Sequence, residues 1–118
     1  MNFYLHPQAE AELVDTIAYY DTCDYGLGLE FAEEVYSTIS LIRQYPNACP
    51  QLSPNTRRGL TKRFPYGIIF QIQSETISII AIANLHKRPN YWKNRAKEEQ
   101  ACYDKEYIKS HTPKKSLD

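Results

Sequence analysis

The sequence predicts an α+β domain in which a helical hairpin packs on one face of an antiparallel β-meander. Apolar residues recur at helical spacing in the first 45 residues, and from Arg57 onwards the period changes to two. The chain has 118 residues, of which 42% are hydrophobic, which is enough for one domain with one core. No apolar run approaches the ~20 residues that a membrane-spanning helix needs.

The first half of the chain predicts a short strand followed by two helices. The apolar stretch Phe3–Leu5 is expected as the strand, and Pro7 suits the first turn of a helix, where its missing N–H costs nothing. Two apolar faces then follow at spacings of three and four: Ala9, Leu13, Ile17 and Tyr20, and then Phe31, Val35, Ile39 and Ile42, widened by Ala32 and Tyr36. Gly26 and Gly28 predict the turn that ends the first helix, and prolines at 46 and 50 end the second.

The second half predicts three strands, over residues 57–64, 66–73 and 76–83. In the middle strand Ile68, Phe70 and Ile72 share one face. In the last strand Ile77, Ile79, Ala81 and Ala83 are expected on one face, and Ser78, Ile80 and Ile82 on the other. Because this strand is apolar on both faces, we expect it at the centre of the sheet. Residues between Pro46 and Pro54 are expected to form a loop.

We therefore expect one domain over residues 1–95 and a C-terminal extension over 96–118, helical to about Lys109 and polar beyond it. The three cysteines are widely spaced and odd in number, without a Cys-x-x-Cys pair, which is typical of free thiols in a reducing cytoplasm. No secretory signal, metal-ligand spacing or glycine-rich phosphate loop is present, so no cofactor and no metal are expected.

Charge is strongly segregated along a chain whose net charge is zero. Residues 1–51 carry eight acids and one base, whereas residues 52–95 carry eight bases and one acid. This asymmetry predicts an acidic side and a basic side, the latter able to attract nucleic acid or an acidic protein segment. Mutual neutralisation of the two halves is the alternative.

The basic residues fall in two groups, one on the first meander strand and one after the last strand. In an antiparallel meander the ends of these strands lie at the same end of the sheet. Lys62 and Arg63 are therefore expected near His86, Lys87 and Arg88. The residues expected to bind a target or a phosphate are Arg57, Arg58, Lys62, Arg63, Lys87, Lys93 and Arg95. A solvated rim is the alternative reading of the same charges, but a solvated face usually mixes both signs and these segments lack acidic partners.

Three residues after the last strand are candidates for catalysis: His86, Arg88 and Tyr91. In cleavage of RNA, His86 or Tyr91 would move the proton of the 2′-hydroxyl, while Arg63 and Arg88 would hold the phosphate. Tyr91 and Trp92 are placed either to stack on bases or to pack the final turn against the sheet, and packing is the commoner fate of Trp.

Together, "HPQAEAELVDTIAYY", "GLGLEFAEEVYSTISLIRQYP", "RFPYGIIFQI" and "ISIIAIANLHKRPNYWKNR" resemble the RelE/ParE toxins of type II toxin–antitoxin systems. The most specific pieces are "RFPY" and the pattern H-x-R-x-x-Y-W-x-x-R. The resemblance runs in order from about Asn2 to Arg95 and implies the same strand–helix–helix–meander fold.

The resemblance implies a toxin of the plasmid stabilisation type, which inhibits growth when freed from the acidic antitoxin of the adjacent gene. ParE-like toxins poison DNA gyrase, whereas RelE-like toxins are mRNA interferases that cut messages on the ribosome. RelE-like enzymes place an Arg after the aromatic that opens the middle strand, where this chain has Gly67. Loss of such a cation costs ~10²–10³ in rate, which favours the ParE-like reading.

Two alternatives stay open: a ribosome-dependent mRNA endoribonuclease, and a non-toxic member that only pairs with an antitoxin. Whether the protein is an enzyme is therefore undecided by the sequence. The antitoxin is expected to lay an acidic, amphipathic C-terminal segment in a groove and against the patches at 57–63 and 87–95.

Overall fold

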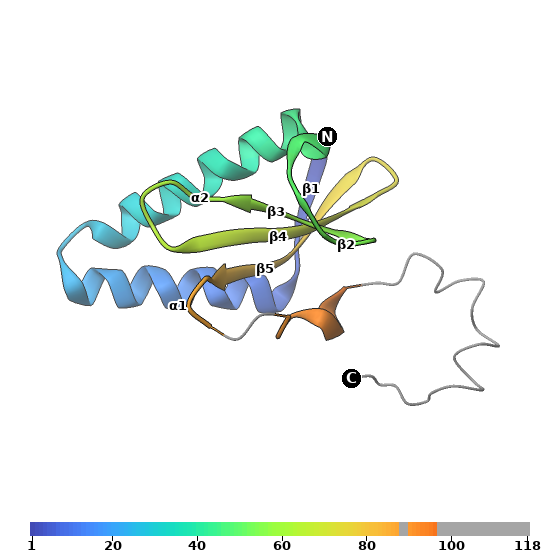
Figure 1. Ribbon diagram of the computed structural model, residues 1–118. Coiled ribbons are helices and arrows are strands. Elements are labelled where there is room, and N and C mark those ends of the chain that lie inside the picture. Colours follow the sequence, from blue (N-terminus) through green and yellow to red (C-terminus); the bar gives the residue numbers. More distant parts are fainter. Residues whose placement is uncertain (88–89, 97–118) are drawn as a thin grey trace.

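A computed structural model describes residues 1–87 and 90–96 of the chain (Figure 1). The elements in order are β1 (Asn2–Leu5), α1 (Pro7–Cys23), α2 (Leu27–Gln44), the 3₁₀ helix η1 (Pro46–Ala48), β2 (Gln51–Ser53), β3 (Thr56–Leu60), β4 (Tyr66–Gln73), β5 (Thr76–Asn84) and the 3₁₀ helix η2 (Lys93–Arg95). The predicted helix in the C-terminal extension lies outside the described residues. Within the described part of the chain, no helix is long and apolar enough to cross a membrane.

The five strands form one mixed sheet in the order β1-β5-β4-β3-β2. β1 pairs with β5 in parallel, and the other neighbours are antiparallel. As predicted, β5 lies inside the sheet, between β1 and β4, and both helices pack on one face. The α+β prediction is confirmed, since Figure 1 shows the helical hairpin as a separate layer along the sheet.

The main core lies between the helices and the sheet. The four residues predicted to form the apolar face of α2 are all buried. None is more than 2% exposed: Phe31, Val35, Ile39 and Ile42. At the end of the core nearest the α1–α2 turn, the rings of Tyr20 and Phe31 contact each other, and each contacts the rings of Phe64 and Tyr66. Tyr36 was predicted to widen the buried stripe, but it is 48% exposed, because it lies one position past Val35, outside the face of α2 that is buried.

A bulge in β5 corrects the predicted faces of that strand. Ile69 pairs with Ala81 and the next residue of β4, Phe70, pairs with Ile79, so Ile80 is an extra residue without a partner in the ladder. An extra residue reverses the alternation beyond it. Ile82 therefore joins the helix-side core, while Ile80, Ala81 and Ala83 form a second cluster on the other face.

Two boundaries in the second half also differ from the prediction. The expected loop between Pro46 and Pro54 contains η1 and the short strand β2, which pairs with the start of β3 around a turn at Pro54 and Asn55. β3 ends at Leu60 rather than at residue 64, because the Thr61 hydroxyl donates to the carbonyl oxygens of Phe64 and Tyr66 and turns the chain out of the sheet.

Gly26 and Gly28 have different roles at the turn between the helices. Gly26 has φ +84° and makes the turn, whereas Gly28 lies within α2. A Cβ on Gly28 would lie 2.4 Å from the Ile17 carbonyl oxygen, and the Gly28 N–H donates to Asp21 at 2.9 Å. The close crossing of the two helices therefore requires glycine at 28, although the sequence indicated only a turn residue.

Candidate functional site

The ends of β3 and β5 lie at the same end of the sheet, as the sequence predicted. Leu60 pairs with Gly67, Tyr66 pairs with Asn84, and the Leu85 N–H donates to the Pro65 carbonyl oxygen at 2.8 Å. The β3–β4 loop and the segment after β5 are thus neighbours. In Figure 1 the α1–α2 turn lies at the same end of the molecule.

The β3–β4 loop is held by acidic residues of α2. The Glu34 carboxylate accepts hydrogen bonds from the backbone N–H groups of Lys62 and Arg63, and Arg63 pairs with Glu30 at 2.8 Å. The hydrogen bond and the charge of Glu30 raise the pKa of Arg63. The side chains of Arg63 and Glu30 are 58% and 50% exposed, so water screens the attraction between their charges.

A second acid–base pair fastens the segment after β5 to α1. Arg95 lies 3.0 Å from the Glu12 carboxylate, and their side chains are only 12% and 19% exposed. Arg95 also donates to the Ile80 carbonyl oxygen at 3.1 Å, while Glu12 accepts from the Ile82 N–H at 2.9 Å. β1 ends opposite Ile79, so these two side chains cap the edge of β5 where β1 no longer covers it.

Tyr91 and Trp92 are held in the same closing segment. Trp92 is 7% exposed and packs with Ile69, Ile80 and neighbouring alanines on the sheet face opposite the helices, so the packing reading is confirmed for it. Tyr91 is half-buried, and burial, followed by a hydrogen bond to Glu12, raises its pKa. A raised pKa stabilises the neutral phenol, which makes Tyr91 a poor general base.

The other candidate site residues after β5 that the structure describes are exposed to solvent. His86 is exposed and its backbone N–H donates to the Asn84 side-chain oxygen at 2.8 Å; Lys87 is exposed, with Nζ 5.7 Å from the Tyr91 ring centre. Lys93 is exposed, and Arg88 lies outside the described residues. Lys87 also lines a pocket of about 110 Å³ together with Glu12 and Asp15 of α1.

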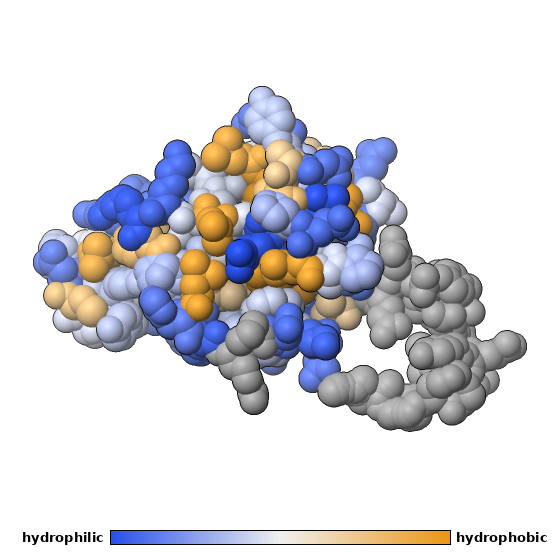
Figure 2. Space-filling model, viewed as in Figure 1, coloured by the Kyte–Doolittle hydropathy of each residue, from blue (hydrophilic) through white to orange (hydrophobic). Residues whose placement is uncertain are grey.

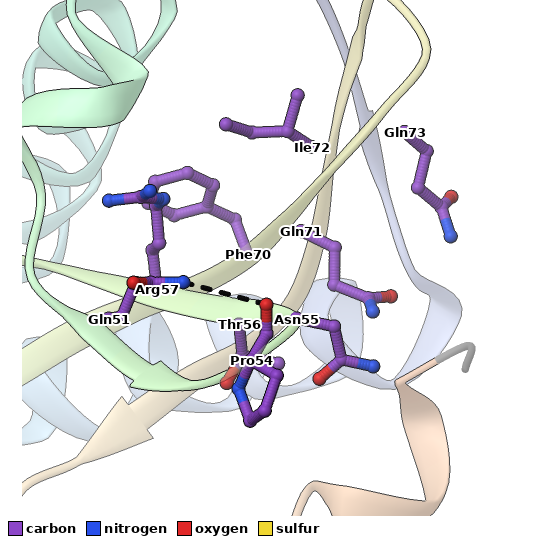
Figure 3. Close-up of a pocket in the computed structure, with 9 residues that line it drawn as sticks. All are labelled: Gln51, Pro54, Asn55, Thr56, Arg57, Phe70, Gln71, Ile72 and Gln73. Carbon is purple, nitrogen blue, oxygen red and sulfur yellow. Dashed lines mark hydrogen bonds between the residues drawn. The ribbon is translucent and has the colours of Figure 1, made fainter. Parts of the chain in front are cut away.

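Arg57 lies away from this cluster, towards the β2 end of β3. Its guanidinium donates to the Cys49 carbonyl oxygen at 2.6 Å and to that of Asn47 at 3.3 Å, which anchors the chain before β2. It borders a polar pocket of about 190 Å³ (Figure 3). Figure 3 shows Arg57 pointing to one side of the sheet, and Gln71 and Asn55 to the other.

Arg58 points to the opposite face of β3 from Arg57 and crosses Gly67. A Cβ on Gly67 would lie 3.0 Å from the Arg58 Cδ and 3.1 Å from its Cγ. The alkyl stem of Arg58 thus fills the space into which a side chain at position 67 would project. The two cations of β3 therefore lie on opposite faces of the strand. The predicted single basic surface is smaller than expected, because Arg57 and Arg58 point in different directions and Arg63 and Arg95 pair with carboxylates.

Sequence reasoning did not locate an apolar groove between α2 and the outer edge of β3. It has a volume of about 390 Å³ and is lined by Thr38, Leu41, Ile42, Tyr45, Ala48, Cys49, Pro50, Arg58, Gly59 and Leu60. Leu41 and Leu60 are 50% and 54% exposed. Figure 2 shows apolar and strongly hydrophilic residues interspersed on the face of the molecule that it presents. Leu41, which lies off the buried row of α2, was the available sequence signal.

No protein-family model and no curated protein matches the sequence. Among solved structures, the fold is similar to that of a chain in the structure described as the chromosomal ParDE TA system from P. aeruginosa. The two share 19% identity with a TM-score of 0.66, over 73% of this chain and 97% of that chain. The RelE/ParE-like fold predicted from the sequence motifs is therefore confirmed.

Proposed function

We propose that the protein is the toxin of a type II toxin–antitoxin system of the plasmid stabilisation type. It pairs with an acidic antitoxin in the cytoplasm and inhibits growth when freed from it. The observation that carries this proposal is the fold shared with a chain of the P. aeruginosa ParDE structure, nearly all of which is covered. We further propose that it acts by binding a protein, DNA gyrase being the first target to test.

The surroundings of the candidate catalytic residues favour binding over RNA cleavage. Arg95 and Tyr91 are both engaged with Glu12, and Gly67 supplies no cation where RelE-like enzymes have one. General acid–base catalysis requires groups within hydrogen-bond reach of the reacting proton, with a pKa near the working pH. Tyr91 does not meet the second requirement, because its pKa is raised.

The charge of the helical layer also disfavours the ribosome as a target. Exposed acids lie along α1, in the turn after it and on the first half of α2: Glu10, Asp15, Asp21, Asp24, Glu30 and Glu33. A surface with this charge repels the phosphate backbone of ribosomal RNA, which proteins bind mainly through Lys and Arg. A protein target has no such uniform charge.

A ribonuclease is the second candidate, because His86, Lys87 and Lys62 are all exposed at one end of the molecule. His86 would then be the proton carrier and the lysines would hold the phosphate. This candidate requires cleaved messages in arrested cells, which the binding toxin does not produce.

Induced expression in a host that lacks the neighbouring gene tests the proposal. We expect growth arrest, and rescue when the neighbouring gene is expressed together with this one. Purified protein at saturating concentration should inhibit supercoiling by gyrase; unchanged supercoiling would remove gyrase as the target. Normal growth at high expression of folded protein would contradict the toxin proposal and leave the non-toxic antitoxin-binding member.

A further inference from the structure

The side of the helical hairpin that is turned away from the sheet carries large apolar residues exposed to solvent. Val14 of α1 is 57% exposed, and Leu29 and Tyr36 of α2 are 63% and 48% exposed. The spacing of apolar positions placed Tyr36 in the core, yet it lies on this outer side. Large apolar side chains that gather on one surface of a protein mark a site of interaction.

The close crossing of the two helices brings these residues together. A Cβ on Gly28 would lie 2.4 Å from the Ile17 carbonyl oxygen, so these two residues mark the point where α1 and α2 cross. The helices run antiparallel (Figure 1), so residues before Ile17 lie beside residues after Gly28. Two rows at spacings of three and four form what we call the outer hairpin surface, all of it exposed except the half-buried Ala32. They are Ala11, Val14 and Ala18 on α1, and Leu29, Ala32 and Tyr36 on α2.

The helices that carry this surface are rich in acids and almost without bases. α1 has four acids and no base, and α2 has three acids and one base, Arg43. Arg43 is already engaged, because its Nε donates to the Met1 carbonyl oxygen at 2.6 Å. The exposed Glu10 and Glu33 are the chain neighbours of Ala11 and Ala32, so carboxylates border the apolar rows. The outer hairpin surface therefore suits an occupant that is both apolar and positively charged.

Charge also separates the possible occupants. A second copy of the chain, docked by the same surface, would bring the acids of one hairpin against those of the other, which like charge disfavours. Nucleic acid and an acidic segment, such as that of the proposed antitoxin, are repelled for the same reason. A basic protein segment finds complementary charge instead. Apolar rows at helical spacing on two neighbouring helices are suited to the apolar face of a third helix.

We infer that the outer hairpin surface docks a basic, amphipathic helix of a partner protein. The apolar face of that helix covers Val14, Leu29 and Tyr36, and its Lys and Arg residues lie against Glu10 and Glu33. The inference goes beyond the proposed function. It adds a docking surface on the side of the helices away from the sheet, and it requires neither an antitoxin nor inhibition of growth.

Binding of a synthetic peptide to the full-length chain tests this surface. The probe is a peptide of about 18 residues, with Leu at every third or fourth position and Lys elsewhere, which forms an amphipathic helix. Calorimetry should show binding that weakens as salt is added, because the charges at the border of the surface are exposed. A peptide of the same composition in scrambled order should bind about tenfold more weakly, and a version with Glu in place of Lys should not bind.

Substitutions in the chain locate the binding. Leu29→Gln and Tyr36→Gln should each weaken binding of the probe about fivefold, because they remove apolar contact without a change of charge. The matched control is Leu60→Gln, at a residue of β3 that is 54% exposed, which should leave the affinity unchanged. Glu33→Gln should weaken binding at low salt, whereas Glu75→Gln, at an exposed acid between β4 and β5, should not. Thermal unfolding checks that each variant is folded.

Two results would overturn the inference. One is equal binding by the wild type and the Leu29 and Tyr36 variants, or equal binding of the scrambled peptide, because the attraction would then be charge alone. The other is a dimer of the free chain that Tyr36→Gln dissociates in sedimentation, because a second copy would then cover the surface. Neither result bears on growth arrest or on the antitoxin, so failure of this inference is distinguishable from failure of the proposed function.

Discussion

The Glu12 carboxylate lies 3.0 Å from the Arg95 guanidinium and joins α1 to the segment that follows β5. The same two side chains bind the carbonyl oxygen of Ile80, the bulge residue of β5, and the N–H of Ile82, two residues beyond it. A cation that the sequence indicated for target binding is thereby part of the fold. The sequence left open whether the acidic and basic halves of the chain neutralise each other. Arg63 and Arg95 do pair with acids of the first half, Glu30 and Glu12, and so are not part of a free basic surface.

Removal of Arg95 should destabilise the protein more than removal of Arg63. Arg95→Met leaves the largely buried Glu12 without its cation, and we expect a loss of about 2–3 kcal/mol in the free energy of unfolding. Arg63→Met is the matched control, because its pair with Glu30 is exposed and screened by water, so the loss of free energy of unfolding should be clearly smaller. Urea denaturation measures both, and equal losses would contradict the structural role of Arg95.

The two glycines at the helical turn should respond differently to the same change. Gly28→Ala puts a Cβ 2.4 Å from the Ile17 carbonyl oxygen, and forcing the helices apart should cost about 2–3 kcal/mol. Gly26→Ala meets no atom within 4 Å and only strains a residue with φ +84°, at about 1 kcal/mol. Denaturant midpoints give the order; a larger loss at Gly26 would refute the close crossing.

Ionisation of Tyr91 should destabilise the fold at alkaline pH. Burial and the hydrogen bond to Glu12 raise the pKa of Tyr91 above its ordinary value of 10. The folded state therefore favours the neutral phenol, so this stability is complete below about pH 10 and is lost as pH rises through the folded-state pKa. Between pH 9 and pH 11, the free energy of unfolding should fall more steeply in the wild type than in Tyr91→Phe. Parallel curves would show that Tyr91 is not held as described.

The thiols of Cys49 and Cys23 should differ in reactivity. Burial raises the pKa of Cys49, which lines the groove, whereas Cys23 is exposed near the end of α1. Since the thiolate is the reactive form, Cys49 should be alkylated more slowly than Cys23 at pH 7.5, and the difference should narrow as pH rises. Mass spectrometry of the Cys102→Ser variant measures both rates; faster modification of Cys49 would contradict its partial burial.

The helices and the paired strands could be predicted because their signals are local. The helical spacing of apolar residues up to Ile42 on α2 indicates which face of the helix is buried. The alternation of residues around Ile68 does the same for β4. The bulge at Ile80 could not be predicted, because isoleucine suits either face of a strand and the extra residue is fixed by Glu12 and Arg95 from elsewhere in the chain.

The candidate site was harder to predict than the fold for the same physical reason. The sequence indicated correctly that the ends of β3 and β5 meet, since that follows from strand order. It did not indicate that Glu34 and Glu30 hold the β3–β4 loop or that Arg58 lies over Gly67, because these contacts join distant segments. The assignment of His86, Arg88 and Tyr91 to catalysis stays a prediction.

Mapping of RNA 5′ ends across the transcriptome, after induction of the wild-type protein, tests most directly whether the proposed toxin acts by binding rather than by cleavage. The account predicts growth arrest with messages that remain intact, so that the 5′ ends match those of uninduced cells. New 5′ ends within coding regions, appearing before growth stops and absent from a His86→Ala variant, would contradict it and establish the ribonuclease.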